Sequence, residues 1–164
     1  FIGKNLNKKI FLINDDICDL NIKTKTFDAV WTVQTLQHIP DFSKAIKNIY
    51  KILKNNSIFF NYNLNINPII KFIYNIIKKK YIIKGYTKLF YLNRSSENQK
   101  NIINKTFKNN VKTRYCELLF HPDLKIFFSG SENSIVGKFD SLLNGYENYK
   151  KIFARQECFI VKKN

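Results

Sequence analysis

The sequence has 164 residues, 45% hydrophobic residues and a formal net charge of +16. This length fits one domain, and the apolar content suffices to bury a core, which excludes an intrinsically disordered chain. Only three of the 28 basic residues are arginine, so we interpret the charge as a lysine-rich surface and expect no specific nucleic-acid partner.

The first part of the chain predicts a strand, helix, strand unit. Residues 9–14 (KIFLIN) and 27–33 (FDAVWTV) are short apolar runs typical of buried strands, and we expect Phe27 and Trp31 in the core. A helix begins after Asp41 and has apolar residues at helical spacing as far as Leu53. The pair Asn55-Asn56 ends this helix, and residues 57–62 (SIFFNY) form the next strand. This order predicts a parallel sheet.

The second part of the chain has a different pattern. Residues 67–110 are rich in lysine and aromatic residues at helical spacing, which predicts a helical lid inserted into a single domain that spans 1–164. Residues 111–120 form a strand, residues 137–143 a short helix, and residues 152–162 the last strand.

Three segments within residues 11–60 together resemble a known family. They are FLINDDICDL, TFDAVWTVQTLQHIPD and IKNIYKILKNNSIFF, and they resemble the second half of a class I S-adenosylmethionine-dependent methyltransferase of the small-molecule type. The last third resembles, less specifically, methyltransferases that modify surface glycans. The resemblance implies an α/β Rossmann-like fold with sheet order 3-2-1-4-5-7-6 and an antiparallel last strand. The family's Pro-Gly-Gly turn is replaced here by Asn55-Asn56-Ser57, which asparagine's tolerance of positive φ allows.

The resemblance also implies a cofactor site for S-adenosylmethionine. The carboxylate of Asp16 would accept a hydrogen bond from the adenine amino group, and the amide of Ile17 would meet a ring nitrogen. The alternative is that Asp15 or Asp16 only caps a turn. Further along the chain, Thr32, Val33 and Gln37 would lie along the cofactor.

Two histidines are candidates for a catalytic base. His38 follows the strand that would contact the cofactor, and His121 lies in RYCELLFHPDL, where the resemblance places the substrate side. Packing roles are the alternative for both. Tyr115, Glu117 and Asp123 are further candidates for the substrate side.

One part of the family pattern is absent. The five glycines cannot supply a GxGxG loop, and the sequence begins at Phe1 and contains no methionine. We therefore predict a C-terminal portion of the domain in which the first two strands and the glycine loop are missing. The consequence would be a mixed sheet of four strands, with the strand at residues 9–14 detached or paired at an edge.

These observations predict S-adenosylmethionine-dependent methyl transfer to a small-molecule, glycan or lipid-linked acceptor, with little activity in a fragment. The alternative is a non-enzymatic basic module that binds nucleic acid or an anionic membrane. Residues 67–92 could supply a peripheral membrane contact, because basic amphipathic helices bind such surfaces. The cysteines show no metal-ligand spacing and no apolar run reaches the length of a membrane span, so we expect a cytoplasmic protein without a metal.

Overall fold

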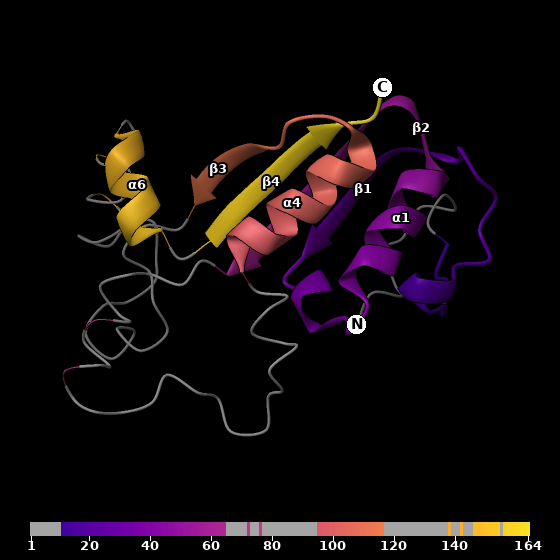
Figure 1. Ribbon diagram of the computed structural model, residues 1–164, viewed down its shortest axis with the longest axis horizontal. Coiled ribbons are helices and arrows are strands. Elements are labelled where there is room, and N and C mark those ends of the chain that lie inside the picture. Colours follow the sequence, from indigo (N-terminus) through magenta and orange to yellow (C-terminus); the bar gives the residue numbers. More distant parts are fainter. Residues whose placement is uncertain are drawn as a thin grey trace.

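The computed structural model describes residues 11–64, 72, 76, 95–116, 138, 142, 146–154 and 156–164. Within these ranges a sheet is covered by helices on one face (Figure 1). The elements in chain order are η1 (Ile17–Asp19), β1 (Phe27–Val33), η2 (Leu36–His38), α1 (Phe42–Ile52), β2 (Leu53–Leu64), α4 (Ser96–Phe107), β3 (Lys112–Cys116), α6 (Glu147–Phe153) and β4 (Gln156–Lys162).

The sheet is mixed, with four strands in the order β1-β2-β4-β3. Strands β1 and β2 are parallel, whereas β4 runs antiparallel to both of its neighbours. This order is the 4-5-7-6 part of the order that the resemblance implies, and it confirms the predicted mixed sheet with an antiparallel last strand. Residues 11–14 of the predicted first strand lie outside the sheet, and Phe11 is 82% exposed. Residues 9 and 10 lie outside the described ranges.

Helix α1 connects the two parallel strands and packs its apolar face on the sheet. Asp41 caps its first turn by accepting a hydrogen bond from the amide of Lys44 at 2.9 Å. Strand β2 begins directly at Leu53, four residues before the predicted start at Ser57, so the predicted break at Asn55-Asn56 is wrong. Asn56 nevertheless has a φ of 62°, the conformation for which asparagine was expected to replace glycine.

Helices α1 and α4 lie side by side on one face of the sheet and enclose the core (Figure 1). The ring of Phe107 on α4 stacks on Phe59 of β2 with centroids 5.9 Å apart, and Tyr50 of α1 meets the edge of the same ring. Helix α4 is therefore a core helix, although it falls within the predicted lid at 67–110. Most of the remainder of that predicted lid lies outside the described residues.

The opposite face of the sheet carries Trp31, which is 69% exposed. The prediction that Trp31 is buried is wrong, because alternate side chains of a strand point to opposite faces and both core helices cover the other one. Its ring meets only the edge of Tyr62 among the aromatic contacts of the described residues, at a centroid distance of 5.9 Å.

The last part of the chain differs from its prediction at one boundary. Helix α6 extends to Phe153, so residues 152 and 153, predicted as the start of the last strand, are helical. Strand β4 begins at Gln156. Strand β3 agrees with the prediction as far as Cys116, and residues 117–120 lie outside the described ranges, as does most of the predicted helix at 137–143.

Lys163 holds the C-terminal end of α1 against the end of β4. Its ammonium group donates to the carbonyl oxygens of Tyr50 at 2.7 Å and Leu53 at 2.8 Å, and it lies 4.1 Å from the centroid of the Tyr50 ring. The side chain is 5% exposed. The last carbonyl groups of a helix lack partners inside the helix, so this lysine satisfies acceptors that would otherwise be buried unpaired.

We expect Lys163→Met to lower the free energy of unfolding by about 2 kcal/mol, because it keeps most of the packing but removes two charge-assisted hydrogen bonds. Urea denaturation measures the change. The neighbouring exposed Lys162→Met is the control and should change stability by less than about 0.5 kcal/mol. Equal stability of the two variants would show that the Lys163 contacts do not support the helix end.

Candidate functional site

The carboxyl ends of β1 and β2 meet at one edge of the sheet, where parallel α/β sheets bind their ligands. Strand β4 runs antiparallel, so its first residues lie at this same edge: Asn63 of β2 is the partner of Glu157 of β4. Tyr115, near the end of β3, is the partner of Glu157 on the other side. This edge therefore gathers the ends of β1, β2 and β3 and the start of β4.

Asp16 forms a local turn at the start of η1. Its Oδ1 accepts from the amide of Cys18 at 2.8 Å, and the preceding Asp15 accepts from the amides of Asp16 and Asn21, each at 2.9 Å. Both aspartates thus cap turns, which was the alternative considered for them. A carboxylate offers about four acceptor positions, so the exposed Asp16 can also accept from a ligand amine.

Element η1 is fixed against α1. The carbonyl of Ile17 accepts from the side chain of Asn48 at 3.0 Å, and the thiol of Cys18 approaches the carbonyl of Asp41 at 3.6 Å. The amide of Ile17 lies in the first turn of η1, where helix geometry supplies no acceptor. A carboxylate beside such an amide fits the adenine edge of the predicted cofactor. The structure thus offers a donor and an acceptor of the right kind at Ile17 and Asp16.

The turn after β1 carries Gln37 and His38. Gln37 is 2% exposed, and its Nε2 lies 3.5 Å from the carbonyl of Gln34 and 3.3 Å from Nε2 of His38. Its Oε1 is buried and has no hydrogen-bond partner among the described residues. His38 is exposed beside it. The structure thus brings the predicted cofactor residue Gln37 and the predicted base His38 together.

The other predicted residues have separate positions. The hydroxyl of Thr32 donates to Oδ1 of Asn61 at 2.9 Å, on the face covered by the helices. Val33 is 46% exposed. His121, Glu117 and Asp123 lie outside the described residues, whereas Tyr115 lies in β3.

A buried layer of amides crosses the sheet beneath the first turns of α4. Gln99 is fully buried, and its Oε1 accepts from Nδ2 of Asn61 at 3.2 Å and from Nδ2 of Asn63 at 2.5 Å. Together with Thr32, these groups connect β1 to β2 and α4. Oδ1 of Asn63 is buried and has no hydrogen-bond partner among the described residues. Buried polar groups are expected to be paired, so this oxygen is an exception within the layer.

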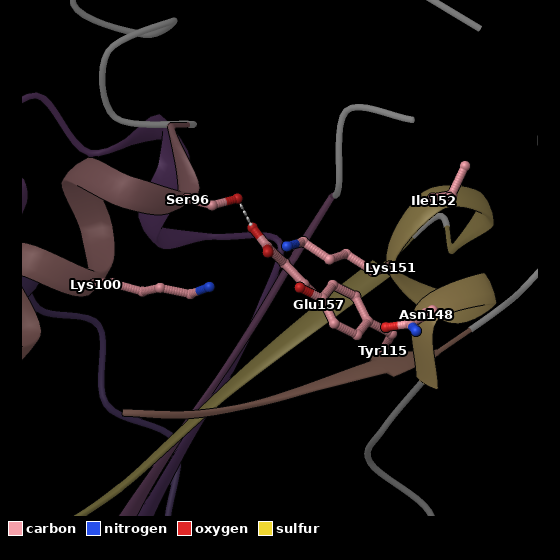
Figure 2. A pocket seen from close by; sticks show the side chains of 7 residues that line it. All are labelled: Ser96, Lys100, Tyr115, Asn148, Lys151, Ile152 and Glu157. Carbon is pink, nitrogen blue, oxygen red and sulfur yellow. Dashed lines mark hydrogen bonds between the residues drawn. The ribbon is translucent and has the colours of Figure 1, made fainter. Parts of the chain in front are cut away.

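A cavity of about 540 Å³ lies beside this layer, between α4, α6 and the strands β3 and β4 (Figure 2). Glu157 is its buried carboxyl group, with 2% exposure, and it accepts a hydrogen bond from the hydroxyl of Ser96. Among the described residues, its lining also includes Lys100, Tyr115, Asn148, Lys151 and Ile152. This volume lies in the range of sites for small molecules.

The electrostatics of Glu157 are set by its burial. Desolvation raises the pKa of this carboxyl above its ordinary value of 4.5, and the hydrogen bond from Ser96 and the charge of Lys100 oppose the rise only in part. Perturbed carboxyl groups in a cavity are candidates for functional sites. Glu157 was not among the site residues predicted from the sequence, although its alternation with Phe159 and Val161 places it on the buried face of β4.

Two further properties follow from the described residues. They contain no group of three or more His, Cys, Asp or Glu side chains that could hold a metal ion. Nor does any helix within these ranges have the length and apolar character that crossing a bilayer requires.

The four strands, with their order and the antiparallel β4, correspond to part of a Rossmann-like methyltransferase fold. Residues 3–61 match the family model described as a methyltransferase domain, which is just over a third of the chain. This range includes Asp16, Ile17, Gln37 and His38. A comparison with curated proteins found no match.

Solved structures support the same fold. A SAM-dependent methyltransferase from Thermotoga maritima aligns with 94% of this chain and 65% of its own, at 18% identity and a TM-score of 0.57. One from Archaeoglobus fulgidus aligns with 94% of this chain and 68% of its own, at 16% identity and a TM-score of 0.55. The cyclase SpnF aligns with 91% of this chain and 54% of its own, at 15% identity and a TM-score of 0.52. The chain thus spans roughly half to two thirds of the length of these proteins.

The raised pKa of Glu157 predicts how stability depends on pH. Protonated Glu157 contributes to the free energy of unfolding in full below about pH 4.5. This contribution is lost as the pH rises through the raised pKa of the folded state. The variant Glu157→Gln is neutral throughout and should therefore gain stability relative to the wild type over this window. Urea denaturation at pH 4.5 and pH 7.5 measures the difference.

The control is Glu97→Gln, which removes an exposed carboxyl from the same end of α4. Because Glu97 is exposed, this variant lacks the burial that underlies the gain expected for Glu157→Gln and should not reproduce it. If Glu157→Gln loses stability relative to the wild type as the pH rises, the carboxylate is stabilised by its surroundings and the assigned direction is wrong.

Proposed function

We propose that the protein transfers a methyl group from S-adenosylmethionine to a small-molecule acceptor. The observation that carries this proposal is the combination of the sheet order β1-β2-β4-β3, with its antiparallel β4, and the methyltransferase match over residues 3–61. Acceptors attached to a glycan or a lipid belong to the same proposal. The lysine-rich charge has no feature beside it that favours a non-enzymatic basic module.

The adenine end of the cofactor would be held at η1. The Asp16 carboxylate accepts from the adenine amino group, and the Ile17 amide donates to a ring nitrogen, while the contacts of η1 with α1 keep both groups in place. Thr32 and Val33, the last residues of β1, and Gln37 in the following turn would lie along the cofactor. S-adenosylmethionine supplies a methyl group already activated on a sulfonium.

The remaining work for the protein is to position the acceptor. An activated methyl group requires a nucleophile held close and in line, so proximity is the largest expected contribution to the rate. A base is needed only for an acceptor that must lose a proton, and the exposed His38 beside Gln37 is the described candidate. The fold alone does not fix the reaction, since the cyclase SpnF shares it.

Binding of S-adenosylhomocysteine to the full-length protein tests the cofactor site. We expect calorimetry to detect binding, and Asp16→Asn to weaken it about tenfold, which corresponds to about 1.4 kcal/mol. Asparagine can still accept from the Cys18 amide, but its amide group opposes the adenine amine with a second donor. A weaker affinity of Asp16→Asn would thus report the loss of adenine recognition and not the loss of the turn at Asp16.

The matched control is Asp19→Asn, which changes the same charge in the same turn and should leave affinity within about twofold. Equal affinity of Asp16→Asn and the wild type would remove Asp16 from the site. Absence of binding in the wild type would overturn the proposed function. Transfer of a tritiated methyl group from S-adenosylmethionine to a pool of small molecules then distinguishes a methyltransferase from a cyclase that has the same fold.

A further inference from the structure

A second cavity lies between helices α1 and α4, which Figure 1 shows side by side over the sheet. Its volume is about 610 Å³, and among the described residues its lining comprises Ser43, Lys47, Ile102, Lys105 and Thr106. Both helices turn other residues, such as Ile46 and Phe107, toward the core. This α1–α4 groove is therefore formed by the outer sides of the two helices. None of the residues proposed to hold the cofactor lines it.

The α1–α4 groove carries two lysine side chains, one from each helix. Lys47 and Lys105 are both exposed, and within the described ranges the ammonium group of neither forms an ion pair or a hydrogen bond. Two like charges that line one small groove repel each other, and an anion bound between them offsets this repulsion. The groove thus favours a negatively charged ligand.

The acidic side chains of the two helices do not neutralise this charge. Both helices are described from N-cap to C-cap, and the acidic residues in these two ranges are Asp41 and Glu97. Asp41 accepts from the amide of Lys44 as the N-cap of α1. Glu97 lies in the first turn of α4, eight residues before Lys105, which corresponds to about 12 Å along the helix. Neither carboxylate lines the groove.

The remaining polar groups of the lining suit a phosphate monoester. Ser43 lies four residues before Lys47, so both side chains lie on one side of α1 and the hydroxyl can donate to the same anion. The hydroxyl of Thr106 already donates to the carbonyl of Ile102 at 2.9 Å. A phosphate monoester carries a charge of about −1.5 to −2 at pH 7 and three acceptor oxygens, which matches two ammonium groups and one hydroxyl. A carboxylate would bring a single charge.

The shape of the groove favours a small molecule over a polymer or a membrane surface. Its volume lies in the range of sites for small molecules. Proteins that bind single-stranded nucleic acid stack its bases on aromatic side chains, and no described aromatic residue lines this groove. An interfacial helix presents a broad apolar face to the lipid, whereas the apolar residue here is the half-buried Ile102. Ile102 instead provides apolar contact for the carbon skeleton of an organic phosphate.

We propose that the α1–α4 groove binds the phosphate group of a small phosphorylated organic molecule. Lys47 and Lys105 hold the phosphate, Ser43 donates to it, and the carbon skeleton lies against Ile102. The site is separate from the cofactor edge and goes beyond the proposed function, because its chemistry requires neither S-adenosylmethionine nor methyl transfer.

Three anions test the ligand class: butyl phosphate, pentanoate and inorganic phosphate. Amide NMR spectra of the isotope-labelled full-length protein, recorded during titration at physiological salt concentration, measure affinity and locate binding. We expect butyl phosphate to shift the signals of the groove residues. It should bind at least about tenfold more tightly than pentanoate and about threefold more tightly than inorganic phosphate, which lacks the carbon chain.

Two outcomes of this titration would contradict the proposal. Equal binding of pentanoate would show a site without preference for phosphate. Shifts spread evenly over the exposed lysines of the chain would show diffuse counterion binding in place of a site at the groove.

Variants of the two lysines test the position of the site. Lys47→Met and Lys105→Met should each weaken butyl phosphate about tenfold, because each keeps much of the apolar stem and removes one charged donor. The matched control is Lys44→Met, which removes an exposed lysine of α1 that does not line the groove, and it should leave affinity within about twofold. Equal weakening by Lys44→Met and Lys47→Met would show that binding follows net charge and would overturn the proposal.

Two larger partners that carry phosphate complete the test. Binding of a single-stranded oligonucleotide and of phosphatidylserine vesicles is measured separately, and Lys47→Met should reduce it no more than Lys44→Met does. A selective loss with Lys47→Met would assign the groove to that partner and overturn the small-molecule ligand. Binding of S-adenosylhomocysteine should be the same in Lys47→Met and the wild type, so a failure at the groove leaves the proposed function intact.

Discussion

The antiparallel pairing of β4 with β2 is the constraint on which the rest of the structure depends. Every strand of a purely parallel sheet would end at the ligand edge, whereas β4 begins there, opposite Asn63. Its first residues can therefore place side chains at that edge while its later residues, Phe159 and Val161, fill the core. One strand thus supplies both the buried carboxyl of the Glu157 cavity and part of the apolar layer beneath α1 and α4. The pairing also brings Lys163 to the end of α1.

The distribution of polar and apolar residues on the covered face follows from this arrangement. Away from the ligand edge, the face is apolar and the rings of Phe59 and Phe107 stack on one another. Toward the ligand edge, the same face carries Asn61, Asn63 and Gln99, which bond to one another. Buried amides of this kind contribute little net stability, because each hydrogen bond replaces one with water. Their position at the edge where parallel sheets bind ligands is better explained by function than by stability.

The sequence predicted the parts of the fold that local patterns determine. The apolar spacing after Asp41 predicted α1, and the β-branched run at 27–33 predicted β1, because both patterns repeat over a whole element. The start of β2 at Leu53 was missed because α1 ends at Ile52 and the strand follows with no residue between them. The burial of Trp31 was predicted wrongly because its residue type does not reveal which face of a sheet is covered. Glu157 was missed because its importance depends on Ser96, 61 residues earlier in the chain.

The two candidate subsites differ in the kind of stability they require. Asp16 and Ile17 lie in a short turn that two contacts hold against α1. The thiol of Cys18 approaches the carbonyl of Asp41, and the side chain of Asn48 donates to the carbonyl of Ile17. Glu157 lies in a central strand that pairs on both sides, so its position is fixed by the whole sheet. A buried carboxyl requires such rigidity, since a loosely held one would turn toward water and lose the desolvation that raises its pKa. The central position of β4 thus holds Glu157 in the core, where no ion pair with another described residue accompanies it.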